Sequence, residues 1–401
     1  MHNITEVTVF SVGDSRKVGT WSNVPYCLTE TLLAKNIKVN RVNLGMGFVA
    51  KVVNALSRQA SALLSLGNSD YGYSRSLLHY RAIKRRIARA VQSYPDADVN
   101  IFLTFSFSSA GLSRQTTVLF ADWTLDHWVN QFQGREPNSL ERAAIARENS
   151  EIEAADWVFV LFPGIADYMK TRYSNPRIAY LGNVVNSLIN VGEPADSIAL
   201  KRKSQMLLFI GRRQYRQGAR RLIDAFWSLK PRYPDLTVNI VGMTAGDLGS
   251  VPPGVTCHGY LDKGKEQERD LYYALLRNAR GIVNTTSKWA AFSSMIEAMH
   301  FYTPVVVTPY DEFVRTFSND IDFGFYCRDE GVQTLCTQIE KLLDEHNYEA
   351  RCVKAHEAVA EFTWSAYVDR LLMTIGSGTL ATPQPPLEGT TGELRSQSYQ
   401  S

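Results

Sequence analysis

The sequence lacks the segments with which proteins cross or enter membranes. No run of eighteen apolar residues occurs anywhere in its 401 residues. The first residues, Met1 to Val12, run directly into a predicted strand without a basic leader and a long apolar core. The sequence therefore predicts a protein that neither spans a membrane nor is secreted through a visible signal, and a cytoplasmic location fits best.

Paired cysteines and a strong net charge are also missing. The five cysteines are odd in number and widely spaced, with no pair at the two-residue spacing of metal and redox motifs. This pattern indicates a reducing compartment. The formal net charge is only +3, so nothing in the charge points to a nucleic-acid partner.

What is present is a soluble globular composition of 45% apolar and 21% charged residues. The chain is too long for one ordinary core, and two domains of roughly 150 to 200 residues are the natural division. We predict an N-terminal domain over residues 1–188, a linker over 189–204 and a C-terminal domain over 205–362. From Gly376 the composition shifts to Gly, Ser, Thr, Pro and Gln, which predicts a disordered tail over 377–401.

The pattern within each predicted domain alternates strands and helices. A strand at Val7–Val12, a loop at Gly13–Pro25, a helix at Tyr26–Lys35 and a strand at Val39–Leu44 form a βαβ unit. Such units build parallel sheets whose sites lie at the carboxyl ends of the strands. The first loop lacks the GxGxxG fingerprint, which argues against a dehydrogenase. The fold class is therefore α/β with two Rossmann-like domains.

The predicted helix at residues 77–94 carries a basic face. Arginines and a lysine lie opposite apolar residues, an arrangement that suits contact with an anionic membrane surface. A sheet-covering helix with a solvated basic face explains the same pattern. The basic residues are Arg81, Lys84, Arg85, Arg86 and Arg89.

An acidic and aromatic cluster follows the buried strand Thr116–Ala121. Asp122, Trp123, His127 and Trp128 stand just past its carboxyl end, and indole rings stack on sugar faces. We predict that Trp123, His127 and Trp128 bind an acceptor and that Asp122 is catalytic. Aromatic packing, with Asp122 as a helix cap, is the alternative.

A second acidic pair, Asp96 and Asp98, has the spacing of a metal-binding DxD motif. Its place in a turn before a strand favours a solvated loop.

The stretch Lys288–Val307 combines a small-residue turn, a short helix carrying Glu297, and a buried strand after Pro304. Free N–H groups at a helix start suit a phosphate, and a carboxylate one turn in suits vicinal hydroxyls. These features predict a site for a nucleoside diphosphate. An ordinary strand-helix-strand unit with a surface glutamate is the alternative.

An arginine-rich turn, Gly211–Gly218, directly follows the predicted strand Met206–Ile210. Its guanidinium groups could hold a diphosphate by charge-assisted hydrogen bonds. A solvated basic loop is the alternative.

The second half resembles the retaining GT-B glycosyltransferases known as glycosyltransferase family four, or glycosyl transferases group 1. The segment LLFIGRRQYRQGARRLIDAF, Leu207 to Phe226, is similar to the family's strand, Gly-Arg turn and helix. VNIVG, VTCHGYL, the IEAM of Ile296 to Met299, TPVVV, and FTW at Phe362 to Trp364 follow in the family's order. LTETLLAKNIKVNRVNL and YLGNVVN in the first half are less specific.

The resemblance implies a GT-B fold, in which two Rossmann-like domains face a central cleft and a helix at residues 363–376 crosses back to the first domain. It also implies that Arg212 contacts the donor diphosphate, that Glu297 contacts the ribose, and that the amides of Ala291 to Ser294 contact the phosphate and sugar. Gly259 to Leu261 would flank the base. The residues expected at the donor are Gly19, Arg212, Arg216, Gln217, Gly259, Tyr260, Leu261, Ala291, Phe292, Ser293, Ser294 and Glu297, with Arg212 also catalytic.

Three positions depart from the family pattern. Trp289 stands where a second glutamate usually contacts the donor sugar, and Ala121, beside Asp122, replaces a histidine. Gln217 replaces the lysine that partners the arginine, which leaves Arg213 or Arg216 as substitutes. The family needs no metal or other cofactor, because cationic side chains and a helix N-terminus neutralise the leaving diphosphate.

The resemblance thus implies a metal-independent, retaining hexosyltransferase. Its substrates would be a nucleoside-diphosphate sugar and a glycan or lipid-linked glycan acceptor, in bacterial surface polysaccharide synthesis. It would work in the cytoplasm or on the inner face of the cytoplasmic membrane. Two alternatives stay open: a nucleotide-sugar epimerase on the same fold, and a catalytically silent relative that binds a partner transferase.

Overall fold

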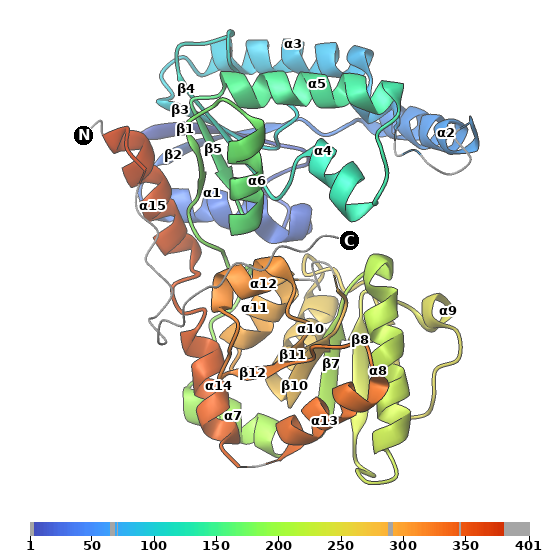
Figure 1. Ribbon diagram of the computed structural model, residues 1–401. Coiled ribbons are helices and arrows are strands. Elements are labelled where there is room, and N and C mark those ends of the chain that lie inside the picture. The colour runs from blue at the N-terminus through green and yellow to red at the C-terminus, as the bar shows by residue number, and fades with distance from the viewer. Residues whose placement is uncertain (1–3, 65–68, 70, 288–291, 345, 381–401) are drawn as a thin grey trace.

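The computed structural model describes residues 4–64, 69, 71–287, 292–344 and 346–380, and it consists of two stacked α/β halves (Figure 1). One six-stranded sheet has the order β2-β1-β3-β4-β5-β6, and the other has the order β12-β11-β10-β7-β8-β9. Neighbouring strands pair in parallel in both sheets. The predicted fold class of two Rossmann-like units is confirmed.

The central strands of the first half are buried on both faces and are rich in apolar residues, whereas the edge strand β2 is largely exposed or half-buried. The rings of Phe10 and Phe102, on neighbouring strands, stack with centroids 4.3 Å apart. The strands are β1 Glu6–Ser11, β2 Lys38–Asn43, β3 Val99–Leu103, β4 Thr116–Ala121, β5 Trp157–Val160 and β6 Ile178–Tyr180. The helices are α1 Val24–Ala34, α2 Phe48–Leu64, α3 Leu77–Ser93, α4 Leu125–His127, α5 Ser139–Ala154 and α6 Pro163–Arg172, with short turns η1 Trp21–Asn23, η2 Tyr73–Arg75 and η3 Trp128–Phe132.

The second half repeats this plan with its most buried strands at the centre. Its strands are β7 Met206–Ile210, β8 Thr237–Val241, β9 Val255–Gly259, β10 Gly281–Asn284, β11 Val305–Val307 and β12 Gly324–Tyr326. Its helices are α7 Pro194–Arg202, α8 Arg216–Leu229, α9 Ala245–Leu248, α10 Glu266–Asn278, α11 Phe292–His300, α12 Asp311–Phe317, α13 Val332–Leu343 and α14 Tyr348–Glu357, and the short turn η4 spans Arg213–Tyr215.

Helix α8 lies unusually close to the end of β10. A Cβ atom at Gly218 would approach the Thr286 hydroxyl oxygen to 2.5 Å, so only glycine allows this approach. The close contact positions the arginine-rich turn, which directly precedes α8, at the carboxyl edge of the second sheet.

The carboxyl edges of the two sheets meet. The ring of Phe162, after β5, lies 5.4 Å from that of Phe292, which follows β10. The backbone N–H of Gly164, at the start of α6, donates to the Glu312 carboxylate at 2.9 Å. Arg315 pairs with Asp167 at 2.9 Å. Loops that follow strands of both sheets therefore touch, and sites in parallel sheets lie at such loops.

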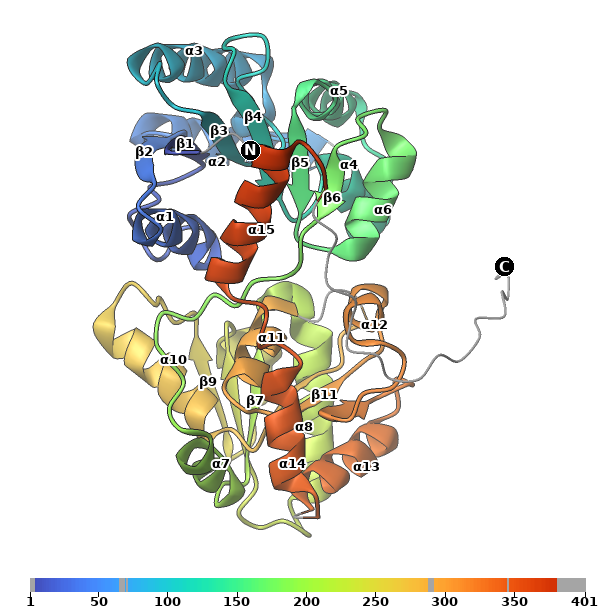
Figure 2. The same cartoon turned by 90° about the vertical axis from the view of Figure 1, so that its left-hand side faces the viewer.

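The last described helix, α15 Trp364–Ser377, lies against the first half, as Figure 2 shows. Trp364, Tyr367 and Leu371 are buried in one core cluster with Leu28 and Phe120 of the first half. The Trp364 indole N–H also donates to the Asn186 side-chain oxygen at 3.0 Å. The exact domain boundaries stay a prediction, and residues 381–401 of the predicted tail lie outside the described residues.

The predicted linker over residues 189–204 stays a prediction, and residues 194–202 within it form helix α7. The sequence shows no sustained apolar period there, yet Ile198 and Lys201 are buried. The Lys201 ammonium donates to the Leu276 carbonyl at 2.5 Å and to the Thr303 hydroxyl at 2.8 Å. Tertiary hydrogen bonds to a buried lysine, together with the packing of Ile198 against Tyr302 and Tyr348, hold this helix. The apolar run at Val99–Phe107 predicts a longer strand than the structure has, since β3 ends at Leu103.

Candidate functional site

Glu297 lies in the middle of α11 and is 4% exposed. One carboxylate oxygen accepts from the Lys263 ammonium at 2.6 Å, and the other accepts from the Tyr272 hydroxyl at 2.8 Å. The alternative of a surface glutamate is therefore wrong. The carboxylate is a buried acceptor with one hydrogen bond on each oxygen, at the carboxyl edge of the second sheet.

Helix α11 starts beside the other half of the molecule. Phe292 is buried among aromatic rings, Ser293 is exposed and Ser294 is partly buried. The first turn of a helix leaves its backbone N–H groups without partners inside the helix. Ala291 and Trp289 lie outside the described residues.

The arginine-rich turn presents Arg212 to solvent. Its guanidinium carbon lies 5.2 Å from the centroid of the Tyr260 ring, a cation–π contact. Arg213 instead pairs with Asp247 of α9 at 3.1 Å. Arg216 and Gln217 open helix α8 and are exposed. Of the two candidates for the missing lysine, Arg213 is thus already held by a carboxylate.

The segment that ends β9 brings three predicted donor residues together. Gly259 has a left-handed φ of +67°, Leu261 is buried and Tyr260 is 55% exposed. Gly19 of the first half lies against the same segment, because a Cβ atom built on it would lie 3.1 Å from Asp262. Predicted donor residues of both halves therefore meet here.

Asp122 follows β4 and is partly buried. Burial raises its pKa to about 6, although hydrogen bonds from its own N–H, the Trp123 N–H and the Trp21 side chain act in the opposite direction. Thr124, not Asp122, caps α4 by accepting from the His127 N–H at 3.1 Å. The alternative of Asp122 as the helix cap is therefore wrong.

The turn that brings Trp21 to Asp122 has an unusual backbone. Trp21, Ser22 and Asn23 have consecutive positive φ values of 39°, 52° and 72°. Residues other than glycine rarely adopt this region, and such strain clusters at functional sites. This backbone could not be predicted from the sequence, because none of the three residues is a glycine.

The predicted acceptor tryptophans belong to an aromatic stack. The rings of Trp123 and Trp128 lie 5.7 Å apart and nearly parallel, and both stack on Phe132. Trp123 also stacks on Phe162 at 6.4 Å, and Phe162 contacts Phe292 of α11. Two ring contacts, Trp123 with Phe162 and Phe162 with Phe292, therefore connect the predicted acceptor residues to the predicted donor residues.

His127 is a neutral side chain at pH 7. Burial lowers its pKa to about 4, while the nearby charge of Asp126 raises it. Its ring lies edge-on to Tyr168, with centroids 5.0 Å apart. The imidazole can therefore exchange hydrogen bonds but supplies no positive charge.

The Asp96 and Asp98 pair lies at the opposite, amino edge of the first sheet. The Asp98 carboxylate accepts from the backbone N–H groups of Thr5 and Glu6 at 2.8 and 3.1 Å. These bonds fix the start of β1. Among the described residues no three His, Cys, Asp or Glu side chains gather as metal ligands.

Several residues of the site had no sequence signal. Lys263 lies in a loop and belongs to no recognisable motif. Its ammonium nevertheless donates to Glu297 and also to the Asn186 carbonyl at 3.4 Å. Asn186 additionally accepts from the Asn23 side chain at 3.1 Å. Contacts between segments so distant in the chain arise only when the two halves meet.

Comparison with known families decides what this arrangement is. The family profile of glycosyl transferases group 1 matches residues 193–359, which include Arg212, the Gly259–Leu261 segment and Glu297. The chain carries a glycosyl transferases group 1 domain. It is a glycosyltransferase that uses a nucleotide-sugar donor, in a family of retaining hexosyltransferases. No curated protein sequence matches the chain.

Solved structures share the GT-B fold of this glycosyltransferase. Sucrose-phosphate synthase from Thermosynechococcus elongatus is 16% identical with a TM-score of 0.65, and the match covers 94% of this chain and 100% of that one. Trehalose 6-phosphate synthase from Burkholderia multivorans has 10% identity, a TM-score of 0.60 and the same coverage. HepE from Anabaena, solved with UDP and glucose, has 13% identity, a TM-score of 0.58 and again the same coverage.

Proposed function

We propose that this glycosyltransferase moves a sugar from a nucleoside-diphosphate sugar to a glycan or lipid-linked glycan acceptor, in the synthesis of bacterial surface polysaccharide. The observation that carries the proposal is the chain of rings Trp123, Phe162 and Phe292. It connects the acidic and aromatic cluster of the first half to the start of α11 in the second. An acceptor bound by one cluster would thus lie next to a donor bound by the other.

In this proposal Glu297 binds the ribose hydroxyls of the donor. Its carboxylate already accepts from Lys263 and Tyr272, and a ribose hydroxyl can bind a remaining lone pair or displace one of these donors. The Lys263 ammonium is the replaceable partner, because its side chain is longer and more mobile than a tyrosine ring. Tyr272 would then keep the carboxylate oriented.

Arg212 would contact the diphosphate, with Arg216 and Gln217 at the start of α8 beside it. Cationic groups at this place stabilise charge that develops on the leaving diphosphate. The amides of Ala291, Phe292, Ser293 and Ser294 would receive the phosphate and sugar. Gly259, Tyr260 and Leu261 would flank the base, with Gly19 facing them from the first half.

Asp122 would act on the acceptor side. As a carboxylate it would orient an acceptor hydroxyl or stabilise positive charge developing on the donor sugar. The half-buried rings of Trp123 and Trp128 would hold the acceptor sugar, and neutral His127 would exchange a hydrogen bond with it.

The basic face of α3 would contact an anionic membrane surface that carries a lipid-linked acceptor. Arg81, Arg85, Arg86 and Arg89 are exposed on this helix, whereas Ile83 and Ile87 are buried. Lys84 is not part of the exposed face, because it pairs with Glu151 at 3.0 Å. None of the described helices is long and apolar enough to cross a bilayer.

A donor panel tests the proposal. Sugars linked to UDP, GDP, dTDP and ADP are incubated with the protein, and released nucleotide is measured. UDP sugars come first because HepE was solved with UDP. We expect release with one nucleotide class and an increase when the true acceptor is added. A changed donor sugar without a glycan product would indicate an epimerase and contradict the proposal.

A further inference from the structure

Helix α2 exposes its apolar residues and turns Asn54, Ser57 and Ser61 toward the protein, whereas its other polar residues are exposed. None of its described side chains from residue 48 to 63 is buried. Surface helices of globular proteins show the reverse arrangement, with the apolar stripe facing the core. The exposed apolar residues are Phe48 at 82%, Val49 at 75%, Val52 at 45%, Val53 at 43%, Leu56 at 61% and Leu63 at 80%.

Hydrogen bonds fix this orientation of α2. Asn54 accepts from the Ser74 N–H at 2.8 Å, and Ser57 accepts from the Tyr73 N–H at 2.8 Å. One turn further on, the Ser61 hydroxyl donates to Ser69 at 2.9 Å. These three side chains share one face of the helix. The opposite, apolar face is therefore held outward.

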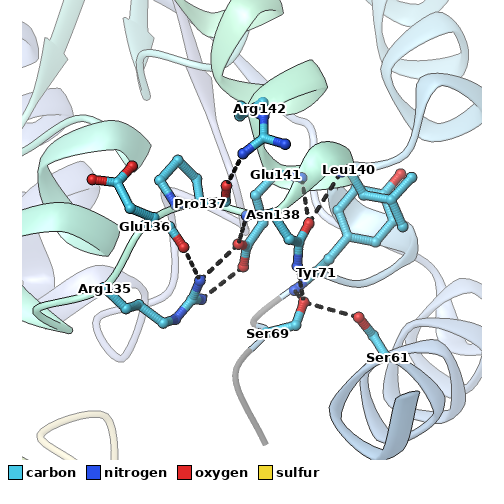
Figure 3. Close-up of polar contacts among 10 residues, drawn as sticks. All are labelled: Ser61, Ser69, Tyr71, Arg135, Glu136, Pro137, Asn138, Leu140, Glu141 and Arg142. Atoms are coloured by element: carbon cyan, nitrogen blue, oxygen red, sulfur yellow. Dashed lines mark hydrogen bonds and ion pairs between the residues drawn. The ribbon is translucent and has the colours of Figure 1, made fainter. Parts of the chain in front are cut away.

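The contact at Ser61 belongs to a larger polar anchor, which Figure 3 shows. Ser69 also accepts from the Asn138 side chain at 2.9 Å, and Asn138 caps α5. Arg135 binds both oxygens of the buried Glu141 at 2.8 Å in the same anchor. This anchor ties the end of α2 to the body of the first half, so the outward apolar face is a feature of the folded protein.

The sequence around α2 is strongly basic. Residues 44–94 hold eight basic residues and one acidic residue, a net charge of +7 in a chain whose formal total is +3. Helix α3 belongs to this segment and is tied to the start of α2, because Arg86 donates to the Gly45 carbonyl at 3.2 Å. The segment that carries the apolar face is thus strongly positive.

We propose that α2 inserts its apolar face into an anionic lipid bilayer, while the arginines of α3 contact the headgroups. An amphipathic helix with basic neighbours lies in the bilayer interface in this way. A symmetric dimer would instead bring two +7 segments together, since a two-fold interface uses the same surface on both copies. The inference extends the proposed membrane contact of α3 and is independent of donor binding.

Vesicle flotation tests the inference with three variants of the full chain. Val52→Gln with Leu56→Gln removes apolar surface from α2. Arg81→Gln, Arg85→Gln and Arg89→Gln remove charge from α3. Trp227→Gln is the matched control, because Trp227 is 57% exposed on α8 of the other half. Each protein is mixed with phosphatidylcholine vesicles with and without phosphatidylglycerol, and its oligomeric state is measured by light scattering.

We expect the wild type and Trp227→Gln to float only with anionic vesicles. The α2 variant should bind more than about tenfold more weakly, because apolar insertion is lost. The α3 variant should lose about fivefold per arginine. Nucleotide affinity without vesicles should be the same in all four proteins, so a missing donor would contradict the proposed function and not this inference.

Three results would overturn the inference. One is the absence of binding to anionic vesicles. Another is an α2 variant that binds as tightly as the wild type while the α3 variant does not, which would leave a purely electrostatic contact. The third is a wild-type dimer that the α2 variant converts to a monomer, which would assign the apolar face to a second copy.

Discussion

Two carboxylates, one at each sheet edge, have opposite environments. Glu297 of the second half receives a hydrogen bond on each oxygen, one of them from an ammonium group. Asp122 of the first half forms no ion pair with any of the described residues, and burial raises its pKa to about 6. Glu297 is thus bonded to a cation and a hydroxyl, whereas burial disfavours the ionised form of Asp122.

The difference suits two different tasks. A carboxylate held by a cation and a hydroxyl is a rigid acceptor, as ribose recognition needs. A carboxylate with a raised pKa is a stronger base and gains more from a cation that forms nearby. The donor half therefore resembles a binding site, and the acceptor half resembles a place for chemistry. The predictions below test this contrast.

The largest effect is expected for Asp122→Asn. If Asp122 orients the acceptor hydroxyl or stabilises charge on the donor sugar, the rate of transfer should fall about 10²- to 10⁴-fold. Donor affinity should barely change. Transfer to the true acceptor and binding of the nucleotide sugar are measured side by side.

Asp126→Asn is the matched control for this experiment. The Asp126 carboxylate accepts from Tyr168 at 2.6 Å and from Asn130 at 2.9 Å, so its role is structural. It should lower stability but leave transfer per folded molecule nearly intact. Transfer by Asp122→Asn within threefold of the wild type would show that Asp122 has no catalytic role.

Glu297→Gln should weaken binding of the nucleoside diphosphate by roughly ten- to a hundredfold, because a charged acceptor of two hydroxyls becomes a neutral one. Calorimetry of the folded variant measures this change. Lys263→Met separates binding from packing, since it removes the other half of the ion pair. If both variants lose only stability and keep nucleotide affinity, Glu297 is simply the partner of Lys263.

Arg212→Ala should weaken diphosphate binding roughly ten- to thirtyfold, because a charge-assisted hydrogen bond is lost. Arg213→Ala provides the comparison on the neighbouring residue, whose guanidinium is held by Asp247. Its effect on affinity should stay within a few-fold. Equal losses in the two variants would mean that the turn acts through general charge and that Arg212 has no specific contact.

The smallest effect is a pH dependence of kcat/KM. The pKa of Asp122 in the folded protein is about 6, above the ordinary 3.8, so the carboxylate is ionised above pH 6 and protonated below it. Transfer should therefore be about tenfold lower at pH 5 than on its plateau. The residual transfer by Asp122→Asn should not show this fall in kcat/KM below pH 6. If the variant shows the same fall in kcat/KM, a group other than Asp122 causes the pH dependence.

Much of the second half could be predicted from the sequence. The bounds of β7, β8, β9 and β10 agree with their apolar runs, and helix α11 carries Glu297 as expected. These elements are local: each buried strand has its own apolar pattern, and each turn has its own Gly or Arg signal. Helix α7 had no such pattern, because its buried Lys201 is satisfied only by distant carbonyl and hydroxyl groups.

The sequence by itself determined the two α/β halves, the family of the second half and the identity of Asp122 and Glu297 as candidate groups. The tertiary structure decided the raised pKa of Asp122 and the hydrogen-bond partners of Glu297, because both depend on burial and on distant segments of the chain. It also decided that α2 faces outward: its pattern is amphipathic, but only hydrogen bonds to Tyr73, Ser74 and Ser69 show which face points to solvent. The period of apolar residues along the sequence indicates that a helix has two faces, and only long-range contacts determine which face is buried.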